Sequence, residues 1–247
     1  MKKFTVFLCA SFLSIALAGG LIFLTAPAQA LPYFQVYIEG STAGDSGSDE
    51  DTWFSDANPF TLYVVGAYKN ETTSITGVTL VISVPEGETG TISITDLGDG
   101  VPNLYTTSAD VDILTDVGGY DGYLAKGSFL PTSFDEHYPF KDDVSDFLVY
   151  EIGEFENIDA NLFDYNADSG VIAATTTSGE QKEYEISITG FTSLHFDAYG
   201  LINGDTWKMN PGSHDATVVP EPATMLLVGC GLIGLAAVGR KKFSKKM

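Results

Sequence analysis

The central part of the chain, residues 31–219, has no cysteine. The protein has 247 residues and two cysteines, Cys9 and Cys230, and both lie in apolar terminal segments. Disulfide scaffolds, structural zinc sites and cysteine nucleophiles are therefore not expected in the centre. The body also lacks any stretch with the helical periodicity of an amphipathic helix, and it has no internal repeat, which argues against a propeller or a solenoid.

Basic residues are almost as scarce in the centre. Residues 31–219 contain 32 acidic residues and five lysines, a net charge of −27 over 189 residues. The two ends are basic instead, with Lys2 and Lys3 at the start and five Lys and Arg residues after position 239. Nucleic acid and anionic lipid are polyanions that such a body repels, so we exclude nucleic acid as a partner.

The N-terminus has the three parts of a secretory signal peptide. Met1-Lys2-Lys3 precedes an apolar run over residues 4–24, and Ala28-Gln29-Ala30 forms a small-x-small cleavage site. We expect residues 1–30 to be removed by signal peptidase, which leaves Leu31 as the first residue of the mature chain. An uncleaved membrane anchor is the alternative, because the apolar run is about as long as a membrane span.

The C-terminus combines a proline motif, an apolar segment and a basic tail. Pro220, Glu221 and Pro222 precede 17 uncharged residues, 223–239, which as a helix measure about 25 Å, just enough to cross a bilayer. Arg240, Lys241 and Lys242 follow at once and are expected to act as a cytoplasmic stop, which leaves the acidic body outside. We therefore expect a transient attachment to the membrane through a transmembrane helix.

This C-terminal segment resembles the PEP-CTERM sorting signal of Gram-negative bacteria. The resemblance implies processing near the Pro-Glu-Pro motif by exosortase, a membrane enzyme, and an association with extracellular polymer and biofilm. The expected organisation is a signal peptide (1–30), an acidic β-domain (31–218) and a sorting segment (219–247) with a basic tail (240–247).

The body alternates polar and apolar residues with a period of two. Residues 91–95 and 185–189 alternate without interruption, and residues 34–38, 60–65, 80–84 and 147–150 also have the composition of strands. Gly, Asp, Asn and Pro separate these segments. The pattern predicts an all-β fold, an antiparallel β-sandwich of jelly-roll or immunoglobulin-like type, with one face of each sheet exposed to water.

Three short segments of the body are similar to the choice-of-anchor N family. They are residues 58–63, 191–200 and 211–216. Proteins of this group are exported domains that occur with alternative C-terminal anchors, so the resemblance implies export and brings no known activity.

His195, Asp197 and Tyr199 alternate along one predicted strand and therefore share a face, opposite the apolar residues between them. If that face is exposed, the row is a possible surface site for a ligand or part of a metal site, and Asp197 favours protonated His195. His214 and Asp215 follow closely enough to join it. The alternative is a structural hydrogen-bonding row that ties the last strand to the C-terminal loop.

Acidic clusters suggest calcium, which binds six to eight oxygen atoms on flexible loops. Asp164, Asn166 and Asp168 have the first three ligand positions of an EF-hand loop, but Ser169 and Thr175 occupy its glycine and closing-acid positions. The alternative is an acidic surface that only keeps the protein soluble. Trp53 and Trp207, beside polar residues, suggest stacking on sugars, although aromatic residues at strand spacing more often lie in the core.

These features predict a non-enzymatic exported protein. We expect it first in the inner membrane with its body outside the cytoplasm, and after processing at the cell surface or in the extracellular matrix. A carbohydrate- or calcium-binding module of that matrix is the alternative function, with extracellular polysaccharide as its partner. A glycoside hydrolase stays open, because a pair of catalytic carboxylates leaves no spacing signature.

Overall fold

The computed structural model describes residues 31–45, 51–85, 87–98, 102–106 and 145–220. The expected signal peptide, Glu221, Pro222, the candidate membrane span 223–239 and the basic tail with Arg240, Lys241 and Lys242 lie outside these ranges. None of the helices formed by the described residues is long and apolar enough to span a membrane.

One sheet, sheet A, has five strands in the order β1-β4-β11-β6-β7, and every neighbouring pair is antiparallel. Its strands are β1 (Phe34–Ile38), β4 (Phe60–Tyr68), β6 (Thr91–Asp96), β7 (Pro102–Thr106) and β11 (Ser178–Thr189). The long strand β11 is central and pairs with β4 on one side and β6 on the other.

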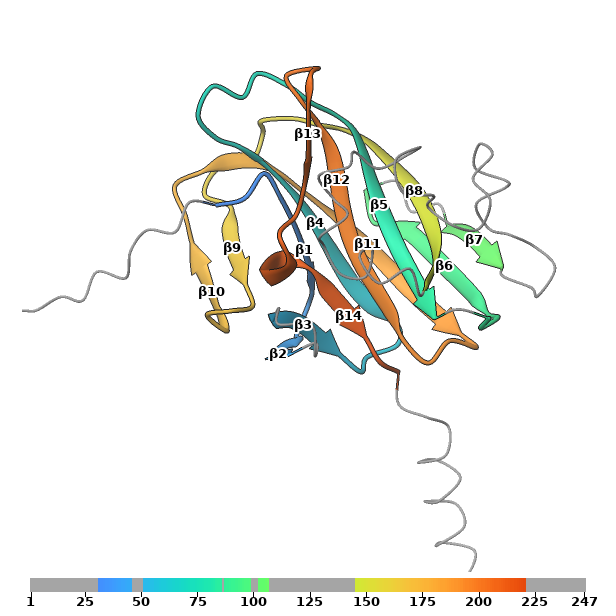
Figure 1. Ribbon diagram of the computed structural model, residues 1–247. Helices are drawn as coiled ribbons and strands as arrows, with labels where there is room; N and C mark the ends of the chain where they lie inside the picture. Colours follow the sequence, from blue (N-terminus) through green and yellow to red (C-terminus); the bar gives the residue numbers. More distant parts are fainter. Residues whose placement is uncertain (1–30, 46–50, 86, 99–101, 107–144, 221–247) are drawn as a thin grey trace, which may run out of the picture. The chain divides into compact units, whose positions relative to one another are not determined.

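The other sheet, sheet B, has seven strands in the order β2-β3-β14-β12-β5-β8, with β13 paired to β12. Its strands are β2 (Thr42–Asp45), β3 (Asp51–Ser55), β5 (Ile75–Pro85), β8 (Ser145–Phe155), β12 (Leu194–Ile202), β13 (Thr206–Met209) and β14 (Ala216–Val218). The last strand, β14, lies inside this sheet, antiparallel to β12 and parallel to β3. Figure 1 shows β14 between them.

The two sheets face each other across one hydrophobic core. Phe60 of β4 packs against Phe196 of β12 with ring centroids 5.7 Å apart, and Tyr150 of β8 meets Tyr184 of β11 at 5.9 Å. Inward-facing side chains of both sheets form a single buried cluster. The prediction of an all-β fold with antiparallel sheets is confirmed except for the parallel β3–β14 pair, and the two facing sheets are consistent with a β-sandwich.

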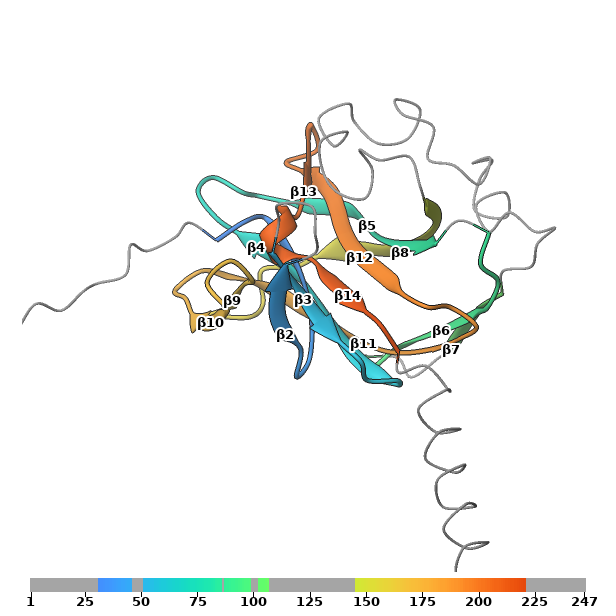
Figure 2. The same ribbon diagram turned by 60° about the horizontal axis from the view of Figure 1, so that its bottom comes forward.

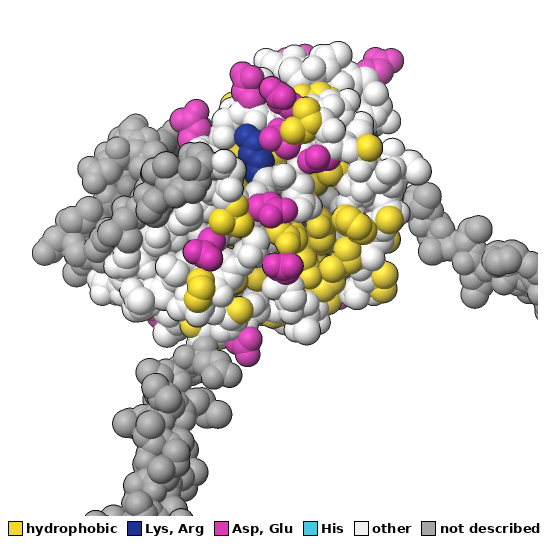
Figure 3. All heavy atoms as spheres, turned by 180° about the vertical axis from the view of Figure 1, so that it is seen from behind, with side chains coloured by type: hydrophobic (Ala, Val, Ile, Leu, Met, Phe, Trp, Pro, Cys, Tyr) yellow, Lys and Arg dark blue, Asp and Glu magenta, His cyan; other side chains and the backbone are white. Residues whose placement is uncertain are grey.

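Part of sheet A has the exposed outer face that the sequence pattern predicts, but its edge strand β1 is buried on both faces. Along the second half of β11, Tyr184, Ile186 and Ile188 are buried in the core while the residues between them are exposed. This alternation is the expected result of a strand with one face on the core and one in water. Seen from behind, the protein shows acidic side chains scattered among uncharged ones, with an apolar patch to one side (Figure 3).

Sheet B departs from the prediction, because the outward faces of its central strands are also buried. On β5, the inward Leu80 and Ile82 belong to the core, and the outward Val81 and Ser83 are buried as well. On β12, every residue from Leu194 to Gly200 is buried. The expectation of one wet face for each sheet is therefore wrong for these strands.

A separate hairpin, β9 (Phe163–Asn166) with β10 (Val171–Ala174), lies beside β1 (Figures 1 and 2). The buried side chain of Gln35 in β1 attaches it, because its Nε2 donates to the carbonyl of Phe163 at 3.1 Å and its Oε1 accepts the N–H of Tyr165 at 2.8 Å. Trp53 of β3 donates its indole N–H to the carbonyl of Tyr165 at 2.9 Å. The hairpin therefore contacts strands from both sheets.

Candidate functional site

A cluster of one histidine and two aspartates lies buried in sheet B. His195 and Asp197 come from β12, and Asp215 immediately precedes β14. Nε2 of His195 is 3.2 Å from Oδ2 of Asp197 and 3.4 Å from Oδ2 of Asp215. The exposed fractions of the three residues are 6%, 0% and 2%, respectively.

The cluster forms where β12 exchanges one neighbour for another. The first half of β12 pairs with β14, and its second half pairs with β13 on the same side. Between β13 and β14 the chain leaves the sheet, forms a short 3₁₀ helix, η2 (Gly212–His214), and re-enters the sheet beside β12. This detour places Asp215 against the two polar residues of β12, across about 20 positions of sequence.

Neighbouring polar groups hold His195 and Asp197 in place. Nδ1 of His195 is 2.8 Å from Oγ1 of Thr217, its register partner on β14. Nδ2 of the buried Asn210 donates to Oδ1 of Asp197 at 3.0 Å, and Oδ1 of Asn210 accepts the N–H of Ala198 at 2.6 Å. The second oxygen of Asp197 is thereby left facing His195.

The two carboxylates control the charge of the histidine. Burial alone lowers the pKa of His195, but the charges of Asp197 and then Asp215, with their hydrogen bonds, outweigh burial and raise the pKa well above its usual value. The two carboxylates therefore favour the protonated form of His195. The three ligand-type atoms lie within 4.8 Å of one another, close enough for one metal ion.

The structure brings two members of the predicted row, His195 and Asp197, together with Asp215. Tyr199, the third member, is buried on the same strand and packs its ring against Trp207 of β13, with centroids 5.7 Å apart. The prediction of a surface site is wrong in its location, because all three side chains of the row are buried. The contacts of His195 instead have the form of the alternative, because they tie β12 to Asp215 before β14 and to Thr217 within it.

His214 does not join this cluster. Its Nε2 lies 2.9 Å from Oδ1 of Asp164 in β9, and its Nδ1 lies 2.9 Å from the hydroxyl of Ser213. The N–H of Ala167 donates to the carbonyl of Ser213 at 2.7 Å. A second buried histidine–aspartate pair thus attaches the β9–β10 hairpin to η2.

The candidate calcium residues form part of a tight hairpin rather than an open loop. Asp164 faces His214, and Oδ1 of Asn166 accepts the N–H of Ser169 at 3.2 Å inside the turn. Asp168 is exposed at the tip, and Gly170, with a φ of +61°, closes the turn into β10. Calcium binding by Asp164, Asn166 and Asp168 stays a prediction that these contacts do not test.

The two tryptophans differ in exposure. Trp53 is buried against the stacked rings of Tyr37 and Tyr165, so it does not offer a face to a sugar. Trp207 is 43% exposed on β13. Of the pair, only Trp207 keeps the accessibility that stacking on a ligand requires.

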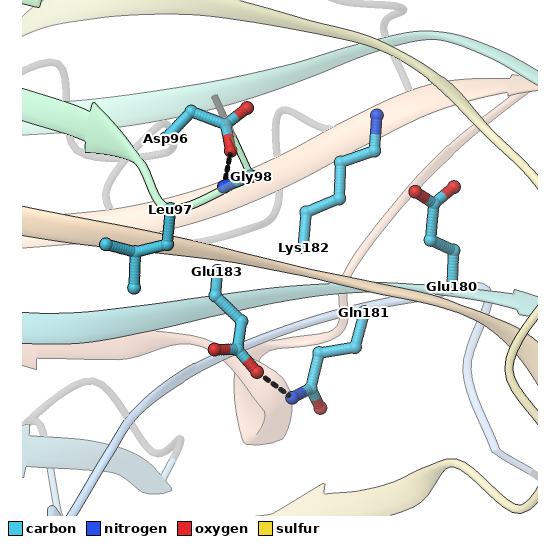
Figure 4. A pocket seen from close by; sticks show the side chains of 7 residues that line it. All are labelled: Asp96, Leu97, Gly98, Glu180, Gln181, Lys182 and Glu183. Carbon is cyan, nitrogen blue, oxygen red and sulfur yellow. Dashed lines mark hydrogen bonds between the residues drawn. The ribbon is translucent and has the colours of Figure 1, made fainter. Parts of the chain in front are cut away.

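A shallow hollow of about 410 Å³ lies at the end of β6, where that strand turns away from β11. Its lining is mixed in charge and comes from Asp96, Leu97, Gly98, Glu180, Gln181, Lys182 and Glu183. Figure 4 shows Lys182 and Glu180 on one side of β11 and Gln181 and Glu183 on the other. Because Nζ of Lys182 donates to the carbonyl of Glu154 at 2.7 Å, the polar groups of the hollow do not converge on one point.

The folded body ends directly before the Pro-Glu-Pro motif. Ala216 and Val218 of β14 are fully buried, and the N–H of Val219 donates to the carbonyl of Ser55 in β3 at 2.8 Å. Val219 is exposed and Pro220 is the last described residue. The first proline of the motif therefore follows the last core contact by two positions.

Residues 218–242 match the family model of the PEP-CTERM protein-sorting motif. The chain carries this sorting motif. The match confirms the resemblance that Pro220, Glu221 and Pro222 suggested, and it supports an exported protein that is sorted by exosortase. The resemblance of the body to the choice-of-anchor N family is not shown by any match and stays a prediction.

No curated protein matches the chain. Among solved structures, the crystal structure of ACE19, the collagen binding subdomain of Enterococcus faecalis surface protein ACE, is similar over 78% of this chain and 99% of that chain. The two sequences are 11% identical and the TM-score is 0.22, which is too low to carry an argument about fold or function.

Sequence reasoning did not identify Asn210 or Thr217 as parts of the cluster. It placed Asp215 near the row, but the separation of Asp215 from His214 into two different clusters was not predicted. The sequence pattern that pointed to these residues was only a polar run between two strands, residues 210–215. It could not show which side chains pair, because their partners lie on other elements.

Proposed function

We propose that this protein is a non-enzymatic exported protein, which exosortase sorts to the cell envelope or the extracellular polymer matrix. The observation that carries the proposal is the PEP-CTERM motif at residues 218–242. In it, Pro220, Glu221 and Pro222 are a recognition strip for another enzyme, and the segments after them attach the chain to the inner membrane until it is processed. Signal peptidase acts at the other end, after Ala30.

The position of β14 supports this route. Pro220 lacks a backbone N–H and therefore cannot donate a hydrogen bond that would continue β14 beyond Val219. A cut near the motif leaves β14 paired with β12 and β3, and the body keeps every core contact of that strand. Sorting can thus remove the membrane segment without unfolding the domain.

The proposal takes the buried cluster around His195 as structural rather than catalytic. A buried cluster does not reach a substrate in this conformation, whereas a catalytic group must lie within hydrogen-bonding distance of the atom on which it acts.

Replacing Pro220, Glu221 and Pro222 together with alanine tests the proposal. The triple variant is expected to accumulate unprocessed in the inner membrane, while the natural sequence is processed and leaves that membrane. Fractionation and immunoblotting, with a tag placed after Leu31, measure both size and location. Deleting the exosortase of the same cell should reproduce the phenotype.

Replacing Val219 and Thr224 with alanine is the control, because these positions flank the strip without belonging to it. The control is expected to be processed normally. If the strip variant reached its usual destination at its usual size, exosortase sorting through this motif would be wrong.

A further inference from the structure

We propose that His195, Asp197 and Asp215 form a structural site for a divalent transition-metal ion, with zinc as the best fit. The ligands are Nε2 of His195 and Oδ2 of each aspartate. From the lack of cysteine we did not expect a structural zinc site in this body. That argument, however, excludes only zinc sites that are built from cysteine thiolates. One imidazole and two carboxylates are also zinc ligands.

The distances fit this assignment. Two ligand atoms that each lie about 2.0 Å from a tetrahedral zinc ion stand about 3.3 Å from each other. Nε2 of His195 is 3.2 Å and 3.4 Å from the two carboxylate oxygens. These separations are longer than the usual charge-assisted N–H···O bond of about 2.7–2.9 Å.

The surrounding hydrogen bonds also fit a metal site. A histidine that binds metal through one ring nitrogen usually donates the N–H of the other to an oxygen atom. Nδ1 of His195 lies 2.8 Å from Oγ1 of Thr217, which leaves Nε2 directed at the carboxylates. Asn210 holds Oδ1 of Asp197 in the same way, and Oδ2 of that carboxylate faces the cluster.

The site also has a polar neighbour for a further ligand. Zinc held by three side chains takes a water molecule as the fourth ligand. Ser83 lies opposite His195 in the β5–β12 register, so both side chains point to the same face. Its hydroxyl is buried and has no hydrogen-bond partner within the described segments. A metal-bound water would give it one.

Charge separates zinc from the alternative, in which a proton holds the cluster together. One protonated histidine between two aspartates leaves one net negative charge among these three buried side chains, and buried net charge is costly. A divalent ion with neutral histidine leaves none. Calcium fits less well, because it takes six to eight oxygen ligands and the cluster offers an imidazole at its centre.

The ion would join β12 to the segment that enters β14. That strand is the last one before the sorting strip, and its pairing keeps the body folded when the C-terminus is cut. A metal that binds only the folded state stabilises it by mass action. The site is therefore a structural cross-link at the end of the domain.

Metal binding is tested on the full chain, extracted in detergent and stripped with a chelator. When zinc chloride is added, each chain is expected to bind one zinc ion. At a free zinc concentration a hundredfold above the Kd, the unfolding midpoint should rise by roughly 5–10 °C. Calcium chloride is expected to have no such effect. Cobalt(II) in the same site should give the strong visible absorption of a four-coordinate ion.

The variants His195→Gln and Asp215→Asn should lose the bound ion and the cobalt spectrum. His214→Gln is the matched control, because His214 is a buried histidine that pairs with a single aspartate, Asp164; it should keep both. Measurements on the natural chain decide the question even where a variant fails to fold. Absence of stoichiometric zinc with an unchanged midpoint, or binding that survives His195→Gln, would overturn the proposal.

Discussion

Two buried amide side chains connect elements that the sheets alone do not join. Gln35 uses both ends of its amide to bind the backbone of β9, and Asn210 uses both ends of its amide to bind Ala198 and Asp197. A buried amide that satisfies backbone groups contributes more than its own hydrogen bonds, since its removal leaves those groups without partners. These two residues therefore hold the hairpin and the loop before η2.

Replacing Gln35 with leucine is expected to lower the free energy of unfolding by about 2–4 kcal/mol. The change keeps the volume of the side chain but leaves the N–H of Tyr165 and the carbonyl of Phe163 without this partner. Chemical denaturation of the exported protein measures the loss. The strands of both sheets should persist, because the hairpin is not part of either sheet.

Gln181→Leu is the control for that substitution. Gln181 is half-buried and accepts the hydroxyl of Tyr165 at 2.9 Å, so water can replace its hydrogen bond. We expect a cost of about 0.5–1 kcal/mol. Equal costs for the two variants would show that Gln35 does not hold the hairpin.

At the scale of strands, the alternation of polar and apolar residues predicts where a strand lies. Residues 91–95 and 185–189 alternate strictly, and they form β6 and the end of β11 in register with each other. The hairpin β9–β10 was missed, because Asp164 and Asn166 have the spacing of a calcium loop and the turn is recognised only from its closing contacts. Composition and a period of two are enough to predict a strand when one of its faces packs on the core and the other faces water.

The candidate site shows where such prediction stops. The alternation of His195, Asp197 and Tyr199 predicts correctly that they share a face, but in an ordinary sheet that face is wet. The burial of that face depends on contacts with segments distant in sequence, which the local pattern does not contain. The position of β14, parallel to β3 and adjacent to β12, has no signature in three residues of sequence.

The β4–β11 pair contains a contact that admits no side chain. A β-carbon at Gly179 would lie 2.0 Å from the carbonyl oxygen of Gly66 and 2.9 Å from Leu162. Gly179→Ala is therefore expected to force the two strands apart and to cost about 3 kcal/mol or more. Thermal or chemical unfolding measures it.

The neighbouring variant Ser178→Ala is the reference for this change. Ser178 lies opposite Tyr68 in the same strand pair and already has a β-carbon. We expect a change within about 0.5 kcal/mol. A mild effect of Gly179→Ala would mean that β11 shifts easily against β4, contrary to the close approach in the structure.

The position of β14 within sheet B predicts how far the chain can be shortened from its C-terminus. Ending the chain after Val219 removes the sorting segment and keeps β14, and this variant should be exported and folded. Ending it after Asp215 removes β14 from between β12 and β3, which exposes the neighbours of Ala216 and Val218. The shorter chain should be degraded or insoluble, as measured by protease resistance in the culture fluid and the periplasm. Similar resistance of the two would show that β14 is dispensable.

At the scale of the whole molecule, charge is distributed by destination. Residues 31–219 have a net charge of −27, while the positive charges gather at the two ends that the export route is expected to remove. The exported body therefore repels itself as well as anionic surfaces. Such repulsion acts over about 30 Å in 10 mM salt and over about 3 Å in 1 M salt.

The stability of the body should consequently rise with salt. We expect the unfolding midpoint of the 31–219 body to increase by roughly 3–6 °C between about 10 mM and about 0.5 M sodium chloride. Scanning calorimetry measures this midpoint. Folding brings the acidic side chains closer together than they are in the unfolded chain, and screening reduces that cost.

A charge-reduced variant separates this effect from a general action of salt on apolar surface. Changing the exposed Glu151, Glu154, Glu156 and Glu185 to glutamine should raise the midpoint in low salt and flatten its dependence on salt. Changing four exposed neutral residues to glutamine is the control, and it should leave the slope as it was; these are Asn157, Thr176, Ser187 and Thr189. A midpoint that falls as salt is added would mean that attraction between surface charges outweighs repulsion, and the acidic composition would then need another physical explanation.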